Sequence, residues 1–387
     1  MLKNHRKTLI FSLFYLFLVI INGFFIVKYS LRYKPIALVL LCWAFLVIIQ
    51  LAALQIISRT FKNHANGGTW TFWIITALFF IFTIYININV DGQLLHVDRW
   101  SAMHAGIEAL LNGKYPYTAI DHLGGRTSNL PALLFLGIPF YLLGDVGYLQ
   151  SFTFLVFAYI IFRLFKDPVI RLSLLFLLIS SPCYLYEIYV KSDLVSNFIL
   201  VLFFVVFCFK YLQQKNIQKP FLLGIFASFV FYTRLTAMIP LILVFFGTFF
   251  KWSLRSKILF ITAGLLTISL LTLIVFMHCP SFSIVMEKNP FVLQNSQLPF
   301  ILSLFCILLP CIIAYHVKNI NRLLRYSVLL LALPVLTALG LYMMKFGIWP
   351  AIRDSRFDLS YLNIITPFLI IYLGCILDKN LSFQTKS

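Results

Sequence analysis

The feature that most constrains this chain is a succession of long apolar segments that recurs from one end to the other. Runs such as Leu38 to Ile49 and Phe198 to Phe209 contain no charged residue and are apolar on every face of a helix. Inside a bilayer each backbone group must be hydrogen-bonded within the protein, so these runs predict helices rather than the short alternating strands of a barrel. Only 11% of the residues are charged, against about a quarter in a soluble domain.

The apolar segments predict an all-α, polytopic integral membrane helical bundle of about 11–13 spans, each about 20 residues long. Residues 1–387 are expected to form a single membrane-embedded domain, because no polar stretch is long enough to fold alone. The block 130–162 must cross an odd number of times, yet it reads as two apolar pieces, so one piece is expected to be re-entrant or tilted. The other candidate spans are 8–27, 36–57, 70–88, 170–182, 194–209, 220–232, 236–250, 258–278, 299–316, 326–344 and 359–377.

The distribution of charge along the chain indicates how the spans are oriented in the membrane. The formal net charge of +19 is spread over short loops between spans, which excludes a basic groove for nucleic acid. Lys and Arg gather near residues 163–171, 210–219, 251–257 and 318–325, and the positive-inside rule places these loops in the cytosol. The loop that begins at Lys28 falls on the opposite side despite its charge.

This assignment puts four polar stretches on the outer side of the membrane, namely 87–129, 187–193, 280–297 and 346–358. The first is much the longest, and long connections in compact proteins are often functional. Residues 89–129 are therefore the expected catalytic loop, carrying short amphipathic helices.

Two acids, Asp91 and Asp98, open this loop directly after a span. From Trp100 to Leu111 apolar residues recur at helical spacing, which predicts an amphipathic helix that lies on the bilayer surface and is ended by Gly113. An ionisable residue at the edge of a span is costly to keep, so Asp98 with Arg99 is a functional candidate. An interfacial salt bridge or a helix cap is the equally open alternative.

The segment Ala109 to Tyr117, ALLNGKYPY, matches a "small-Leu-Leu-x-Gly-x-x-Pro-Tyr" pattern and is followed by a proline-started span at Pro131. In this arrangement the chain resembles the GT-C class of membrane glycosyltransferases, mannosyltransferase-like enzymes that depend on polyprenyl-phosphate sugars. The resemblance covers the amino-terminal half and the many-helix layout, while the carboxy-terminal half matches only in topology. A lone Pro131 replaces the paired-acid or Pro-Pro signature of many relatives, which leaves the sugar unassigned.

The resemblance implies a hexosyl- or pentosyltransferase that takes a sugar from a polyprenyl-phosphate donor to a glycan or lipid-linked acceptor. The expected location is a bacterial cytoplasmic membrane with the active site on the outer face, and an endoplasmic-reticulum membrane with a lumenal site is the open alternative. The catalytic aspartate of the class aligns with Asp98, and Asp91 is the reserve. Lys191 and Asp193 fit a second polar position of such proteins, and Tyr117 is a candidate for sugar contact because it lies in the motif loop.

The reaction itself requires two kinds of group. A base must take the proton of the acceptor hydroxyl as its oxygen attacks the anomeric carbon, and a loop carboxylate suits this task. A cation must stabilise the charge that develops on the departing lipid phosphate. Arg234 lies in a tight turn between two spans, and snorkelling to the headgroups is its equally open alternative. The cationic candidates are Arg99, Arg126, Lys191, Arg234, Arg353 and Arg356.

No cofactor is expected. His96, Asp98 and His104 are a candidate set for a divalent metal, but ordinary interfacial histidines are the favoured interpretation, and His104 is then a candidate for substrate contact.

Two other functions stay open. A lipid-linked sugar transporter is disfavoured because no internal repeat is visible and most charges lie at loop edges. A polysaccharide polymerase more often has its large loop late in the chain.

Overall fold

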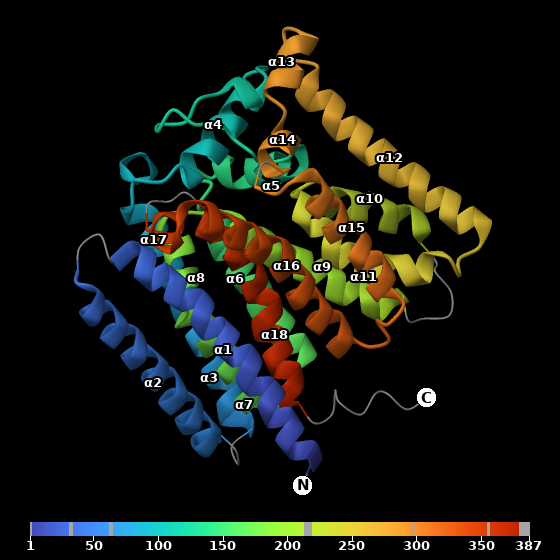
Figure 1. The fold of residues 1–387 in the computed structure, drawn as a ribbon. Helices are drawn as coiled ribbons and strands as arrows, with labels where there is room; N and C mark the ends of the chain where they lie inside the picture. The colour runs from blue at the N-terminus through green and yellow to red at the C-terminus, as the bar shows by residue number, and fades with distance from the viewer. Residues whose placement is uncertain are drawn as a thin grey trace.

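The computed structural model of the chain describes residues 2–30, 34–61, 65–212, 219–295, 297–353 and 357–378. Within these ranges the chain is built from helices, and the only β pairing is an isolated bridge between Ile120 and Arg126. The predicted all-α polytopic membrane bundle is confirmed (Figure 1).

Each predicted span coincides with a helix, and the block that reads as two apolar pieces forms two helices. Several helices start at a proline, because a first-turn residue needs no N–H partner within the helix. The α-helices are α1 (Leu2–Ser30), α2 (Ile36–Phe61), α3 (Ala65–Asn89), α4 (Arg99–Leu111), α5 (Pro131–Leu142), α6 (Tyr148–Leu164), α7 (Pro168–Ile179), α8 (Pro182–Tyr189), α9 (Leu194–Leu212), α10 (Pro220–Phe231), α11 (Met238–Phe249), α12 (Leu254–Phe276), α13 (Phe282–Glu287), α14 (Pro290–Asn295), α15 (Phe300–Ala314), α16 (Ile320–Phe346), α17 (Ile348–Ile352) and α18 (Thr366–Leu377). The short 3-10 helices are η1 (Gly92–Leu94), η2 (Pro116–Thr118), η3 (Leu235–Ala237) and η4 (Leu359–Ile365).

The helices differ in their ability to cross a bilayer. In the part of the chain that the structure describes, seven helical units are long and apolar enough to do so, namely α1, α2, α3, α9, α12, α16 and η4 with α18. The number rises to nine if α7–α8, bent by 57°, and the segment from α13 to α15, bent by 62°, each count as one span. The shorter apolar helices are α5, α6, α10 and η3 with α11.

The ambiguous block forms the helices α5 and α6. Just before α5, the Asn129 side chain accepts a hydrogen bond from Arg234 at 3.0 Å, and Arg234 is also bonded to Asp193. Just after α5, Asp145 pairs with Lys191 at 2.5 Å. Because Lys191 and Asp193 belong to one short turn, α5 begins and ends on the same side of the molecule. This return to one turn is what a re-entrant piece would show, and both α5 and α6 are among the shorter apolar helices.

The core is centred on η4 and α18, whose most apolar window is 94% buried inside the protein. All residues of α18 from Thr366 to Ile376 are buried. This helix packs against α1, α7, α9 and α16, and Figure 1 shows it in red between α1 and α16. A helix that is apolar all round and meets protein on every side is typical of the centre of a large bundle.

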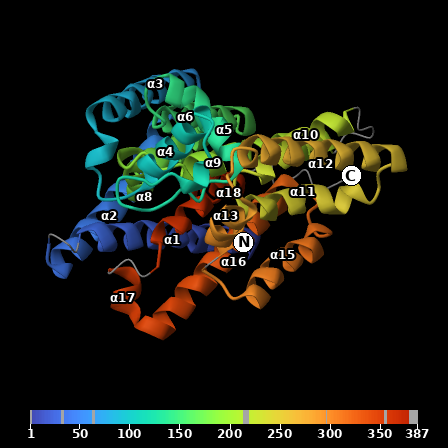
Figure 2. The ribbon, with the colours of Figure 1, turned by 90° about the horizontal axis from the view of Figure 1, so that it is seen from above.

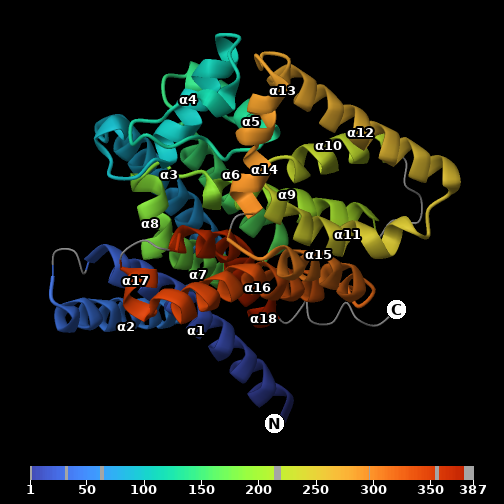
Figure 3. The same cartoon turned by 45° about the horizontal axis from the view of Figure 1, so that its top comes forward.

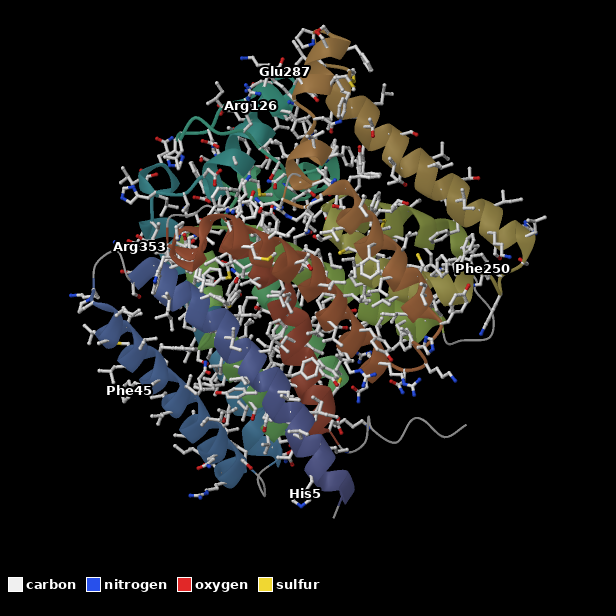
Figure 4. All side chains as sticks on the ribbon, in the orientation of Figure 1. His5, Phe45, Arg126, Phe250, Glu287 and Arg353 are labelled. Atoms are coloured by element: carbon white, nitrogen blue, oxygen red, sulfur yellow. The ribbon has the colours of Figure 1, made fainter. Side chains whose placement is uncertain are left out.

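The spans at the edges of the molecule are much less covered. Only 11% of the α2 window and 22% of the α12 window are buried, and the two helices lie at opposite edges in Figures 2 and 3. Phe45 on α2 is 63% exposed and points away from the bundle in Figure 4. Apolar surfaces of this extent require lipid as their solvent. The chain is an integral, multi-pass membrane protein in contact with membrane lipids.

The pair α10–α12 is held by close backbone approach, so it is sensitive to one added methyl group. A Cβ at Gly224 would lie 2.4 Å from the Phe260 carbonyl oxygen and 2.9 Å from the Ala263 Cβ. We expect Gly224→Ala to lower the free energy of unfolding by about 1–3 kcal/mol, the usual cost of overpacking. Thermal unfolding of the purified protein in detergent measures this.

Gly340 on α16 is the matched control, because a Cβ there would meet no atom within 4 Å. We expect Gly340→Ala to be neutral or slightly stabilising, because alanine favours helix more than glycine does. Equal melting temperatures for the two variants would contradict the close α10–α12 contact.

Candidate functional site

The long loop 89–129 is organised by α4, as its apolar spacing predicts. Asp98 is the residue that precedes the helix, but its carboxylate accepts no capping hydrogen bond. The helix ends after Leu111, and Gly113 adopts a φ of 66°, a left-handed conformation that glycine accepts without strain. The helix-cap alternative for Asp98 is therefore not supported.

The apolar face of this helix, predicted to lie against the bilayer surface, packs against protein. Met103, Ile107 and Leu110, expected to face lipid, are 2%, 0% and 8% exposed and pack in one cluster with Leu134 of α5. Gly137 on α5 allows this contact, because a Cβ there would lie 2.3 Å from the Met103 methyl group. Helix α5 thus covers the apolar face of α4, and protein contacts fix the helix that begins beside Asp98.

A polar cavity of about 520 Å³ lies beside the start of α4. It gathers side chains from the end of α1, the first loop, α8, and the segment before α18. Three of the predicted site residues, Asp98, Arg99 and Arg126, line it. Its charged lining residues are Asp98, Glu187, Asp358, Lys28, Arg99 and Arg126.

Asp98 is the half-buried carboxylate of this cavity. The adjacent Arg99 does not neutralise it by an ion pair, since Arg99 pairs with Asp358 instead. The predicted salt bridge is thus formed by another acid. An aspartate that faces a polar cavity without capping its helix is placed to accept a proton from a bound hydroxyl.

Arg99 is held by two groups from the far end of the sequence. It pairs with Asp358 and donates a hydrogen bond to the Ser360 hydroxyl at 2.9 Å. Burial alone would raise the pKa of Asp358, but Arg99 and Ser360 outweigh it and lower that pKa to about 2. The pair is therefore fully ionised at neutral pH, and it fixes the guanidinium at the cavity wall.

Besides Asp358, two charged lining residues were not predicted from the sequence. Glu187 is 1% exposed, accepts a hydrogen bond from the Asn363 amide at 2.6 Å, and accepts a second from the Val195 N–H at 3.3 Å. The one sequence feature that could have pointed to Glu187 was its position in the stretch 187–193, which is predicted to lie on the outer side. Lys28 is 4% exposed and lines the same cavity.

Arg234 and Asp193 form a buried pair behind this cavity. Their side chains are 2% and 3% exposed, and the Arg234 Nε lies 3.0 Å from the Asp193 carboxylate. Arg234 also donates to the Asn129 side chain at 3.0 Å. Its remaining nitrogen, Nη1, is buried and has no hydrogen-bond partner in the described part of the chain. The snorkelling alternative is excluded by this burial.

Lys191, also predicted, supports the site without lining it. It is 3% exposed, has a positive φ of 52°, and pairs with Asp145 at 2.5 Å. The Trp100 indole N–H donates to the same carboxylate at 3.0 Å. Lys191 and Trp100 therefore tie the start of α4 to the turn after α8.

His104 and Tyr117 are placed by packing. The His104 ring lies between Trp100 and Tyr141, with centroids 4.6 and 4.8 Å away, and burial lowers the pKa of this histidine. The Tyr117 hydroxyl donates to the Asn129 carbonyl at 3.0 Å, and burial raises its pKa. Neither side chain is part of the cavity lining, so the structure does not bring either to Asp98.

The remaining candidates are dispersed. Asp91 is exposed and caps η1 by accepting from the Gln93 N–H at 2.9 Å. Figure 4 shows Arg126 in the first loop, and Arg353 at the end of α17 is exposed and outside the lining. Arg356 lies outside the described residues. Among those that are described, no three His, Cys, Asp or Glu side chains are placed to hold a metal, so His96, Asp98 and His104 are not gathered.

An apolar cavity of about 330 Å³ adjoins the polar one. It lies between α11, α14, α15 and α16, and it shares two lining residues, Gln297 and Tyr361, with the polar cavity. Phe300 and Leu304 on α15 line it and are 74% and 43% exposed, so it reaches the apolar surface of the bundle. A charged chamber thus opens beside an apolar one.

Comparison of the chain with protein-family models, with curated proteins and with solved structures gives no match. The geometry of these two cavities is therefore the basis on which a function is proposed.

Proposed function

We propose that this protein is a GT-C-type glycosyltransferase that moves a sugar from a polyprenyl-phosphate donor to a glycan or lipid-linked acceptor. The observation that carries the proposal is the junction of a charged cavity with an apolar one, at Gln297 and Tyr361. A polyprenyl-phosphate sugar has the same division, with a polar head and a long apolar chain. The proposed location is a bacterial cytoplasmic membrane, with the polar cavity on the outer face.

In this proposal the sugar and the acceptor hydroxyl occupy the polar cavity. Asp98 takes the hydroxyl proton while the acceptor oxygen bonds to the anomeric carbon. The bond between that carbon and the phosphate oxygen breaks, and its electron pair leaves with the lipid phosphate. Arg99 and Arg126, which line the cavity, stabilise this departing charge.

The apolar cavity is proposed to hold the first part of the polyprenyl chain. Ala338 on α16 is 2% exposed and lines it. We expect Ala338→Trp to raise the KM for the lipid donor at least tenfold with little change in kcat, because displacing two methylene groups costs about 1.6 kcal/mol. Sugar transfer by the purified protein in nanodiscs, followed at several donor concentrations, measures both constants.

Leu336→Trp is the matched control on the same helix, because Leu336 is 41% exposed and is not part of the cavity lining. This variant should keep the KM of the unmodified protein. The lipid-donor proposal fails if Ala338→Trp transfers sugar with an unchanged KM, or if no polyprenyl-phosphate sugar is used.

One observation favours a lipid-linked sugar transporter as a second candidate. The α7–α8 pair is bent by 57°, and the Asn22 side chain accepts hydrogen bonds from the Ser181 hydroxyl and the Cys183 N–H at the break. Broken helices are frequent in transporters. Movement of an intact labelled lipid-linked sugar across vesicle membranes would support this candidate.

A further inference from the structure

The residues shared by the two cavities offer a specific head-group site. Gln297 and Tyr361 line both the charged cavity and the apolar one, so they mark the point where a lipid head group meets its chain. The Tyr361 hydroxyl is a hydrogen-bond donor, and the Gln297 side chain carries both donors and an acceptor. An amphipathic ligand that occupies both cavities therefore contacts these two side chains.

The Gln297 amide has a hydrogen-bond acceptor without a partner at this point. Its Oε1 is buried and has no partner in the ranges that the structure describes. A buried acceptor without a partner is costly, and a bound ligand that supplies a hydroxyl at this position removes the cost. Such a hydroxyl belongs to a sugar more readily than to an isoprenoid chain.

Tyr361 lies near two ion pairs. The pairs Arg234–Asp193 and Arg99–Asp358 both interact electrostatically with its side chain. Arg234 brings a buried nitrogen without a hydrogen-bond partner among the described residues, and Arg99 is fixed at the cavity wall by Ser360. Arg99 and Tyr361 both line the polar cavity, so a guanidinium and a hydroxyl donor are together available to a phosphate oxygen.

We infer that Tyr361 and Gln297 form the head-group clamp of this site, with the Tyr361 hydroxyl donating to a lipid phosphate oxygen and the Gln297 carbonyl accepting from the neighbouring sugar hydroxyl. The ligand class is a glycosyl phosphodiester of a long-chain isoprenoid. This inference rests on the proposed function and adds the residues that select the anionic head group over an uncharged lipid alcohol.

The test compares binding of a polyprenyl phosphate with binding of the polyprenol of the same chain length, measured on the intact protein in nanodiscs. Tyr361→Phe removes only the hydroxyl group. We expect it to weaken polyprenyl phosphate binding about tenfold, as for the loss of one hydrogen bond to a charged group, and to leave polyprenol binding unchanged. Tyr342→Phe is the control, since Tyr342 packs on Phe357 and is outside the lining of both cavities.

Gln297→Leu provides the second measurement, with a polyprenyl-phosphate sugar as the probe. This variant should weaken binding of the sugar-bearing lipid several-fold more than binding of bare polyprenyl phosphate. The inference is overturned if Tyr361→Phe binds polyprenyl phosphate as well as Tyr342→Phe does, or if it loses polyprenyl phosphate and polyprenol equally.

The inference and the proposed function fail in different ways. If the protein binds the lipid phosphate through Tyr361 but transfers no sugar, the clamp stands and the glycosyltransferase proposal fails. If sugar transfer occurs and Tyr361→Phe leaves phosphate affinity unchanged, the proposal stands and the clamp is wrong.

Discussion

Asp98→Asn is expected to lower the rate of sugar transfer by about 10²–10⁴-fold, the usual contribution of a general base. The amide keeps the shape of the side chain but cannot take the proton of the acceptor hydroxyl. Because the Asp98 carboxylate neither caps α4 nor pairs with Arg99, folding should change by less than about 0.5 kcal/mol. Transfer of labelled sugar and thermal unfolding, measured on the same preparation, separate the two effects.

Asp91→Asn is the natural control for this experiment. Asp91 is exposed and caps only a short 3-10 turn, so its amide variant should retain transfer within a few-fold. Loss of transfer in Asp91→Asn with normal transfer in Asp98→Asn would exchange the roles of the two acids. Full activity in both variants would remove the general-base mechanism from this loop.

Arg234→Met is expected to produce the largest loss of stability, about 3–5 kcal/mol, the cost of leaving one partner of a buried pair uncompensated. The side chains of Arg234 and Asp193 are 2% and 3% exposed, so water cannot replace the missing charge. The variant also leaves the Asn129 side chain without its donor just before α5. Melting temperature and yield of folded protein measure the effect.

The matched variant removes both charges. Arg234→Met combined with Asp193→Leu should recover most of the lost stability, because a buried pair replaced by apolar residues of similar volume is often neutral. A double variant as unstable as the single one would show that the pair does not act as a unit. A stable single variant would mean that the pair is hydrated in the membrane.

The helices are the part of the fold that the sequence predicts well. Each long apolar run becomes a helix because a backbone in lipid has to bond to itself, and this requirement acts locally. The end of α4 at Gly113 is local in the same way. Such features depend on residues within a few positions of one another, so a single sequence is enough to find them.

The side chains that interact with one another in the site could not be predicted from the sequence. Arg99 pairs with Asp358, which is 259 residues away, and Glu187 is bonded to Asn363, which is 176 residues away. Both contacts depend on how α18 and its preceding segment insert at the centre of the bundle. No spacing rule within one segment reports such an arrangement, so Asp358, Glu187 and Lys28 were missed.

A residue that belongs to the sequence motif does not necessarily line the cavity. Tyr117 lies within the segment that carries the GT-C resemblance, yet its hydroxyl holds the Asn129 carbonyl inside a packed cluster. His104 is likewise held by packing, between the rings of Trp100 and Tyr141. In this loop, the side chains that pack in the interior and those that face the cavity have similar chemistry, and the structure separates them by burial.

The measurement that tests the central claim most directly follows the fate of a donor labelled separately on its sugar and on its lipid, in proteoliposomes that contain the purified protein and acceptor lipids. The account predicts that the sugar label leaves the polyprenyl phosphate and appears on an acceptor, and that Asp98→Asn abolishes this separation. If both labels stay on one molecule that moves to the other leaflet, the protein is a transporter and the glycosyltransferase account is wrong.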